Sequence, residues 1–454
     1  MSDEPTRPLP AAPQEPLPLV RGWGGIARPG RVVRGEDLVR LTEGAVLSRG
    51  LGRSYGDAAL PPPGVREIVG TTLADRYLAF DPSTGVLRAE AGVSLDDMVR
   101  TFLPRGWFAP VSPGTWHVTL GGMVASDIHG KNHHVAGTLG RHVRSLRMRV
   151  ASGDIVNCSR EEHPDLFRAT LGGMGLTGHI LEVELAMERV PSPWIWRESV
   201  LCPDLEELLS TLEDSASWPQ TVAWIDTLST GPRFGRGVLM RGRWARPEEA
   251  PARPPKRGFR PVVPFQAPGW ALNDLTMKAF NTVWYHKQLK PFVQGPVTPH
   301  SWFTPLDSVQ HWYRAYGRRG FTQHQAVIPR EAGREAVRQF CRILARRGGT
   351  GFLCVVKDCG PEGEGLLSFP RPGTSIALDL PITSDTQGLV DELNAFVVEV
   401  GGRIYLTKDA FTRREHFQAM ERDRLPGFAE VRDRWDPERR LRSALSVRLL
   451  GDPA

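Results

Sequence analysis

Short apolar runs separated by Gly, Pro and Asp dominate residues 22–190. We expect strands at four of these runs, because each is short and ends at a strand-breaking residue, namely 45–47, 87–91, 146–150 and 179–185. Helical spacing of apolar positions predicts helices over 95–102, with Ser94 as the N-cap, and over 164–171. Because strands and helices interleave, this half is predicted to be an α+β domain.

The pattern changes after residue 192, and nine of the thirteen Trp residues lie between 194 and 312, which favours a second domain with its own core. Six prolines with basic residues between them fall in 251–268, too many for a helix or a central strand. They predict a mobile surface loop over about 250–270. Strand-like and helix-like runs then follow in the order strand, helix, strand, strand, helix, at 321–329, 330–347, 351–358, 375–382 and 387–400. That order predicts an antiparallel sheet covered by helices on one face.

The chain is therefore expected to have four parts. Residues 1–20 contain six prolines and are predicted to be a flexible arm. Residues 21–191 and 192–402 are predicted to be the two domains, and 403–454 a C-terminal segment. The length of 454 residues and a hydrophobic content of 40% suffice for two such cores and exclude global disorder.

Composition narrows the classes of function. The five Cys show neither CxxC pairs nor zinc spacing, so we expect no disulfide framework, no metal site and a reducing compartment. The net charge of +6 suits an anionic ligand or an acidic lipid surface, although a solvated Arg-rich surface explains it equally well. No apolar run of about 18 residues is present. We expect a cytoplasmic protein, at most peripheral at the inner membrane face, with no nucleic-acid partner.

A glycine-rich loop, Ser48 to Asp57, follows the first predicted strand. Its glycines let backbone N–H groups converge on a phosphate, and Arg49, Arg53 and Ser54 add charge or hydroxyl donors. A plain turn is the competing interpretation. The loop has neither the GxxxxGK[ST] pattern of P-loop NTPases nor GxGxxG opening a long helix, so those two classes are disfavoured.

Two further segments have the composition of a ligand site. Residues 121–126 are small, which permits close approach to a flat ligand, and the polar group from His129 to His134 follows at once. HxxxHH is a weak metal signal without carboxylate or Cys partners, so we favour a polar substrate pocket. Residues 172–178 contain four glycines and lead into a strand, which alone would indicate only a helix stop and a turn.

In this order the three segments resemble the vanillyl-alcohol-oxidase-type FAD-binding domain, and within that superfamily the oxidases of decaprenylphosphoryl-β-D-ribose. The resemblance is carried by RGLGRSYGD (49–57), VSPGT (111–115), GGMVASDIHGKNHH (121–134), ATLGGMGLTG (169–178), RAYG (314–317), FTQHQAVIP (321–329), LLSFPRPG (366–373) and GGRIYLTKD (401–409). It implies that 21–191 form a two-part FAD-binding domain to which 403–454 return, and that 192–402 form the substrate-binding domain.

The resemblance also implies which residues contact FAD. They are Ser48, Arg49, Gly50, Leu51, Gly52, Arg53, Ser54, Tyr55, Gly56 and Asp57 at the pyrophosphate, Gly114, Thr119, Gly121, Gly122, Ser126 and His129 beside the isoalloxazine, and Ile180 and Tyr405. Relatives that bond the flavin covalently often carry His where this chain has Arg53. Since Arg cannot form that bond, we expect the FAD to be non-covalent.

Catalytic and substrate-binding residues are implied in the same way. Lys408 is the expected base or orienting group beside the flavin, with His129 as the second catalytic residue. The alternative for Lys408 is a surface ion pair with Asp409. The residues expected to bind substrate are Tyr55, Lys131, Trp224, Tyr316, Gln323, Gln325, Lys357, Ser375 and Ala377. Lys357 is expected at the phosphate, whereas the two glutamines could equally be the polar face of a half-buried strand.

The implied activity is oxidation of the C2′ hydroxyl of a polyprenylphosphoryl-β-D-ribose, a lipid-linked phosphopentose. This is the first half of an epimerisation to the arabinose form used in cell-wall glycan synthesis, which a separate NAD(P)H-dependent keto-reductase completes. Two alternatives are an aldonolactone or alditol oxidase using dioxygen, and a flavin-retaining glycolipid-binding protein without turnover. Ala377 and Ser375 stand where mycobacterial relatives carry Cys and Asn, which leaves the exact lipid and sugar open.

Overall fold

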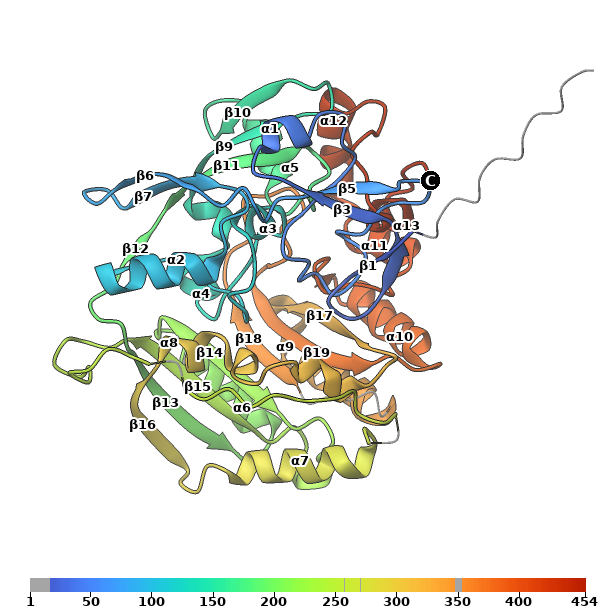
Figure 1. Ribbon diagram of the computed structural model, residues 1–454. Coiled ribbons are helices and arrows are strands. Elements are labelled where there is room, and N and C mark those ends of the chain that lie inside the picture. The colour runs from blue at the N-terminus through green and yellow to red at the C-terminus, as the bar shows by residue number, and fades with distance from the viewer. Residues whose placement is uncertain (1–16, 257, 270, 348–352) are drawn as a thin grey trace, which may run out of the picture.

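The computed structural model describes residues 17–454 except 257, 270 and 348–352. In Figure 1 the blue-to-green first part and the red C-terminal helices lie above the green-to-orange second part. Residues 1–16 of the predicted arm lie outside the described residues. Strand β1 (Leu19–Arg21) begins within the predicted arm, and Val20 is buried in a small apolar cluster, so the predicted boundary at residue 20 is too late.

Two sheets form the framework of the first part. The parallel sheet has the order β3 (Arg31–Arg34), β5 (Glu67–Gly70) and β4 (Ser48–Arg49). The antiparallel sheet has the order β10 (Ile155–Ser159), β9 (Val143–Arg149), β11 (His179–Ala186), β7 (Val86–Glu90) and β6 (Tyr77–Asp81). Short pairs join β1 to β2 (Ala27–Pro29) and β8 (Trp107–Phe108) to β12 (Glu188–Arg189). The helices are α1 (Leu38–Leu41), α2 (Leu95–Phe102), α3 (Leu120–Ala125), α4 (His133–Ala136) and α5 (Pro164–Thr170).

The local predictions for this part are confirmed with one shift. Helix α2 spans the predicted residues, and the Ser94 hydroxyl caps it by accepting a hydrogen bond from the Asp97 backbone N–H at 3.1 Å. The strand predicted over 45–47 is wrong in position, because β4 begins at Ser48. Leu47 is buried, and its carbonyl accepts from the Val69 N–H at 3.0 Å. The chain therefore runs directly from the sheet into the glycine-rich loop.

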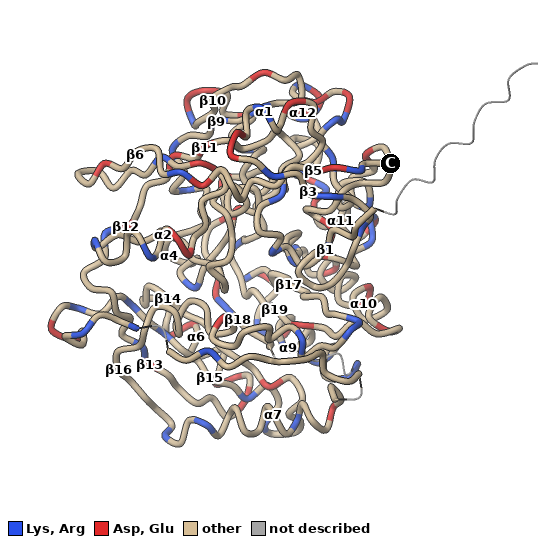
Figure 2. The backbone as a smooth tube through the Cα atoms, viewed as in Figure 1, with Lys and Arg blue, Asp and Glu red and all other residues tan. Residues whose placement is uncertain are grey.

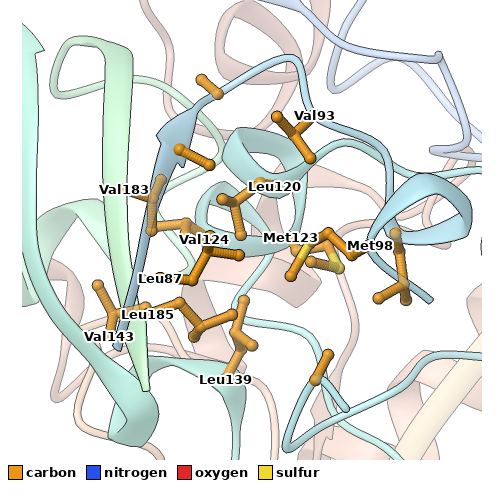
Figure 3. Packing of buried hydrophobic residues seen from close by; sticks show 14 of the residues in the cluster. Leu87, Val93, Met98, Leu120, Met123, Val124, Leu139, Val143, Val183 and Leu185 are labelled. Carbon is orange, nitrogen blue, oxygen red and sulfur yellow. The ribbon is translucent and has the colours of Figure 1, made fainter. Parts of the chain in front are cut away.

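Helix α3 packs against the antiparallel sheet and fixes the position of one side of the site. Figure 3 shows its buried side chains beside those of β7 and β11, namely Leu120, Met123 and Val124 against Leu87, Val183 and Leu185. The apolar residues at i, i+3 and i+4 form one face of the helix. Thr119 caps the helix by accepting from the Gly122 N–H, so this N-terminus is held in a fixed direction.

The second part is built on one antiparallel sheet of eight strands. Its order is β16 (Phe292–Val297), β13 (Ile195–Cys202), β15 (Gly237–Trp244), β14 (Gln220–Ile225), β18 (Cys354–Cys359), β19 (Gly373–Pro381), β17 (Phe321–Pro329) and β20 (Arg403–Ile404). The helices that share a core with this sheet are α6 (Leu205–Asp214), α9 (Gly333–Arg347) and α10 (Thr386–Glu399). The predicted antiparallel sheet with helices on one face is confirmed, as is the α+β class.

Alternation along the central strands decides which residues face the first part. Ala326, Val356 and Ile376 belong to the core under the helices. Successive residues of a strand point to opposite faces. Gln325 and Ala377, which pair across β17 and β19, are therefore on the face that carries no helices.

The remaining helices flank these layers. They are α7 (Asp274–His286), α8 (Pro299–Phe303), α11 (Arg414–Met420), α12 (Leu425–Trp435) and α13 (Ala444–Leu449). The three C-terminal helices share a core with Ala58, Met174 and Leu176 of the first part. The described residues of 251–268 contain no helix or strand, apart from one bridge of Val262 to Gln310. Within the described ranges, no helix has the length and apolar character needed to cross a bilayer.

Candidate active site

A cavity lined by both parts of the chain contains most of the residues that the sequence indicated. Those expected at the cofactor that line it are Ser48, Arg49, Gly50, Leu51, Gly52, Arg53, Ser54, Tyr55, Gly114, Thr119, Gly121, Gly122, Ser126, His129, Ile180 and Tyr405. Those expected at the reacting centre or the substrate are Lys408, Gln323, Gln325, Lys357 and Ala377. The tertiary structure thus brings together segments almost 360 residues apart in the chain.

Six expected site residues lie behind the cavity wall and not on it. They are Gly56, Asp57, Lys131, Trp224, Tyr316 and Ser375. The Asp57 carboxylate accepts from the Arg448 guanidinium at 2.7 and 2.9 Å. A Cβ on Gly56 would lie 1.7 Å from the Asp409 carbonyl oxygen. These two residues therefore fix the loop against the C-terminal segment.

The other four stand behind the substrate end of the cavity. The Lys131 ammonium donates to the backbone carbonyl of Trp302 at 2.7 Å. Ser375 accepts from the Gln325 amide at 3.1 Å, and the Tyr316 hydroxyl donates to a buried carboxylate described below. Trp224 is buried in β14, where it pairs with Val355. Three of these four therefore hold neighbouring groups through hydrogen bonds.

The glycine-rich loop has the form of an anion cradle. Within the described chain, the backbone N–H groups of residues 50–54 donate to no protein acceptor. A Cβ on Gly50 would lie 2.1 Å from the Thr119 Oγ1, so only glycine allows the loop to approach α3 this closely. The Thr71 hydroxyl lines the same cavity and is buried, with no protein partner among the described residues. Free donors on a glycine-rich loop that lines the cavity fit the pyrophosphate of FAD.

Two arginines add positive charge to this cradle and are held by carbonyl groups. Arg49 donates to the backbone oxygens of Ala59 and Arg21 at 2.8 and 2.5 Å. Burial, together with neighbouring arginines, lowers the pKa of Arg49 to about 10, so it remains a cation at neutral pH. The Arg53 guanidinium donates to the His117 carbonyl at 3.0 Å and lies 4.0 Å from the centre of the Trp23 ring. Both charges are therefore positioned before a ligand binds.

His129 is buried at the junction of the two parts. Its Nε2 lies 2.8 Å from the amide nitrogen of Gln325, which makes Nε2 the acceptor and places the proton on Nδ1. That Nδ1 has no protein partner within the described chain. Burial lowers the pKa of His129 well below its usual value, and Lys357, His133 and Lys408 add to the effect. The imidazole is therefore neutral and has one N–H free to donate.

Lys408 projects into the cavity from the segment that follows β20. Its ammonium lies 4.2 Å from the centre of the Tyr55 ring. Burial lowers the pKa of Lys408 to about 7; Asp379 opposes this shift and Lys357 adds to it. The alternative of a surface pair with Asp409 is wrong, because Asp409 is buried and accepts from Arg448 at 2.8 Å.

Asp379 is a site residue that the sequence reasoning did not select. It is fully buried on β19 and accepts hydrogen bonds from the Tyr316 hydroxyl at 3.0 Å and the Gln323 amide at 2.5 Å. Burial raises the pKa of Asp379 to about 6, while these hydrogen bonds and the charge of Lys408 oppose the rise. A lone Asp within the apolar run 375–382 was the available signal. This carboxylate supplies the negative charge that acts on Lys408.

The remaining histidines of the HGKNHH segment make structural contacts. His133 accepts from the Gly360 N–H at 3.1 Å through Nδ1, and His134 Nε2 lies 2.7 Å from the Trp218 carbonyl oxygen. In the part of the chain that the structure describes, no group of three or more His, Cys, Asp or Glu side chains is arranged to hold a metal ion. These histidines join α4 to the second part.

Comparison with known proteins also indicates an FAD-binding domain. The family described as FAD binding domain matches residues 37–159. The chain is 35% identical over 418 residues to the decaprenylphosphoryl-β-D-ribose oxidase of Mycolicibacterium smegmatis, covering 89% of each chain. It is 31% identical to an uncharacterized protein of Streptomyces coelicolor, over 79% of this chain and all of that protein. A cytokinin dehydrogenase of Arabidopsis thaliana is 28% identical over 37% of this chain and 34% of its own. The chain is an FAD-dependent oxidoreductase and belongs to the family of decaprenylphosphoryl-β-D-ribose oxidases.

Proposed function

We propose that the protein oxidises the C2′ hydroxyl of a polyprenylphosphoryl-β-D-ribose to the 2′-keto sugar. The observation that carries the proposal is the placing of Lys408 and Lys357 in one cavity with the glycine-rich cradle. A secondary alcohol needs a base at the reacting hydroxyl, and a phosphodiester needs a cation nearby. The relative that is 35% identical over 89% of this chain is itself named a decaprenylphosphoryl-β-D-ribose oxidase.

The FAD, when bound, supplies the acceptor for the hydride. Lys408, with a pKa of about 7, is partly a neutral amine at neutral pH and is the proposed acceptor of the hydroxyl proton. His129 offers its free Nδ1–H to an oxygen of the sugar. Together the two groups would orient the hydroxyl and remove its proton.

Lys357 and the glutamines of β17 provide the proposed contacts to the phosphate and the pentose. Lys357 pairs in register with Ser375, next to Ala377 on the same strand, so its side chain is on the cavity face. Gln325 already bonds His129 and Ser375, and it therefore couples the sugar contacts to the catalytic imidazole. Ala377 makes this wall smaller than one carrying Cys, with Ser375 behind it in place of Asn, and we propose that this difference affects which lipid-linked sugar is accepted.

The product would be a ketone, so epimerisation requires a second protein that returns hydride to the opposite face. We propose a separate NAD(P)H-dependent keto-reductase as that partner, and a cytoplasmic location with peripheral membrane contact, because the substrate is lipid-linked. The aldonolactone or alditol oxidase and the non-catalytic binding protein are not favoured. A soluble sugar gives no role to the half-buried Lys357 in the cavity wall, and a binding protein gives none to a lysine with a pKa near 7.

Anaerobic mixing of the holoprotein with a short-chain prenylphosphoryl ribose tests the proposal. We expect bleaching of the oxidised flavin absorbance and formation of one equivalent of keto sugar. The matched controls are the prenylphosphoryl arabinose epimer at C2′, free ribose and an aldonolactone. Reduction by the lactone or by free ribose, with none by the phosphoryl ribose, would overturn the assignment.

A further inference from the structure

Positive charge is concentrated in one stretch of the chain. Residues 251–300 contain seven Lys or Arg and a single Asp, a net charge of +6 that equals the net charge of all 454 residues. The rest of the chain is therefore neutral overall. Figure 2 shows Lys and Arg positions along α7 and the turn after it, at one edge of the molecule. A local excess of this size attracts an anionic surface.

The same stretch exposes large apolar side chains. Phe259 is 93% exposed, Leu275 78%, Val283 72% and Leu289 92%. Leu275 and Val283 lie two turns apart on the same side of α7, and large apolar side chains exposed in this way are rare on a surface that meets only water. The basic residues lie among them, since Lys278, Lys287 and Lys290 fall between or beside the apolar positions of α7 and its following turn.

Helix α7 is firmly formed although little of it is covered. Asn273 caps its first turn in a capping box with Thr276. Only Met277 and Asn281, one turn apart, are buried, and the Asn281 amide donates to Asp226 at 2.7 Å. The helix is thus attached along one narrow stripe and presents the rest of its circumference outward. An amphipathic helix with cations beside its apolar face is typical of helices that lie in a membrane interface.

The exposed stretch is joined to the cavity by hydrogen bonds and packing. The Ala267 N–H donates to the Arg314 carbonyl at 2.9 Å, two residues after Trp312, which lines the cavity. Leu272, directly before α7, packs on the cluster of Tyr55 and Tyr316. A partner surface that binds to this stretch would therefore lie close to the substrate end of the site.

We propose that α7 and the proline-rich segment before it dock this protein on an anionic phospholipid bilayer. The inference rests on the proposed function, because a polyprenyl chain is insoluble and must remain in lipid while its phosphosugar enters the cavity. Apolar side chains would insert among the acyl chains while the lysines contact the lipid phosphates. Docking therefore adds apolar burial to charge attraction.

Vesicle co-sedimentation of the full-length holoprotein tests the proposal. We expect binding to equimolar phosphatidylcholine and phosphatidylglycerol, weak binding to phosphatidylcholine alone, and weakening by salt. The variants Leu275→Ser with Val283→Ser, and Lys287→Glu with Lys290→Glu, should each lower the partition coefficient about tenfold or more. Matched controls in the first part, Leu73→Ser with Leu78→Ser and Arg141→Glu with Arg144→Glu, should bind as wild type.

Flavin reduction by the short-chain substrate without vesicles separates this proposal from the one it rests on. Both variants, the one in α7 and the one in the turn after it, should reduce flavin as fast as wild type, since none of the four residues lines the cavity. Normal reduction without vesicle binding overturns the docking surface alone, and absent reduction overturns the proposed function whatever the vesicles show. A third outcome is a wild-type protein that does not bind vesicles but forms a dimer, with the Leu275→Ser, Val283→Ser variant monomeric. That result would overturn membrane docking and assign this face to a second copy of the chain.

Discussion

Replacing Lys408 with Met removes the proposed base and keeps the length of the side chain. The cradle of residues 48–57 is unchanged, so FAD should remain bound at the wild-type ratio. A positioned general base contributes about 100- to 10,000-fold to a proton-transfer step. We expect the rate constant for flavin reduction by substrate to fall within that range.

The pH dependence of the wild type follows from the burial of Lys408. Burial lowers the lysine pKa to about 7, and only the neutral amine can accept a proton. The neutral fraction is about one tenth at pH 6 and about nine tenths at pH 8. Flavin reduction should therefore rise about tenfold between these values and level off above pH 8. Stopped-flow absorbance at saturating substrate, with flavin content measured for each protein, gives both results.

A second substitution separates a base from a fixed positive charge. Lys408→Arg keeps a cation but cannot lose its proton in this range, so it should be as slow as the Met variant and lack the rise near pH 7. Near-normal rates in the Arg variant would show that charge alone suffices. Wild-type rates in the Met variant would refute Lys408 as the base. A rise near pH 7 that persists in the Met or Arg variant would refute it as well.

The remaining predictions concern the charge, the cofactor, the pocket and the fold. Asp379→Asn removes the carboxylate that stabilises the lysine ammonium, so the midpoint of the pH–rate profile should move below about 7. Acid precipitation should release the flavin into the supernatant, because Arg53 cannot bond it. Some nitroaromatic compounds are reduced by a flavin to an electrophile that bonds a nearby thiolate. The wild type should form no such adduct, because none of the five Cys lines the cavity within the described chain. The Ala377→Cys variant should form the adduct, which intact-mass measurement detects. Asp452→Ala should lower the free energy of unfolding by about 3–5 kcal/mol, because it removes the carboxylate that pairs with the buried Arg432 and the two hydrogen bonds of 2.9 and 3.0 Å that Arg432 donates to it.

The first three of these predictions each have a contrary outcome, and the fourth has a matched control. An upward or absent shift of the midpoint would contradict the role given to Asp379. Flavin retained on the precipitated polypeptide would require another attachment residue. An adduct on the wild type would place a native Cys at the flavin. Glu438→Ala, in an exposed pair with Arg440, is the stability control and should change the free energy of unfolding by about 0–1 kcal/mol.

Local features of the sequence determined much of the fold. The Ser94 cap and the apolar spacing after it define α2, and the run 321–329 is the strand β17. Such elements follow from contacts between residues close in the chain. The glycine-rich loop was likewise recognisable, because the conformation it needs is permitted by the residues themselves. Helix α7 was missed, because only two of its residues are buried and its apolar residues therefore do not mark a face turned to the core.

Only the tertiary structure decided how the reacting groups act on one another. Lys408 and Asp379 are separated by 29 positions and lie on different elements, and their pKa values shift in opposite directions because burial disfavours the charged form of each. The sequence likewise could not show that Lys131 and Asp57 stand behind the wall, because both positions depend on partners more than 170 residues away. The sequence shows which side chains are present at each motif. Their removal from water and the distances between them depend on how the FAD-binding part and the second part pack together. Those two quantities set the protonation states on which the chemistry depends.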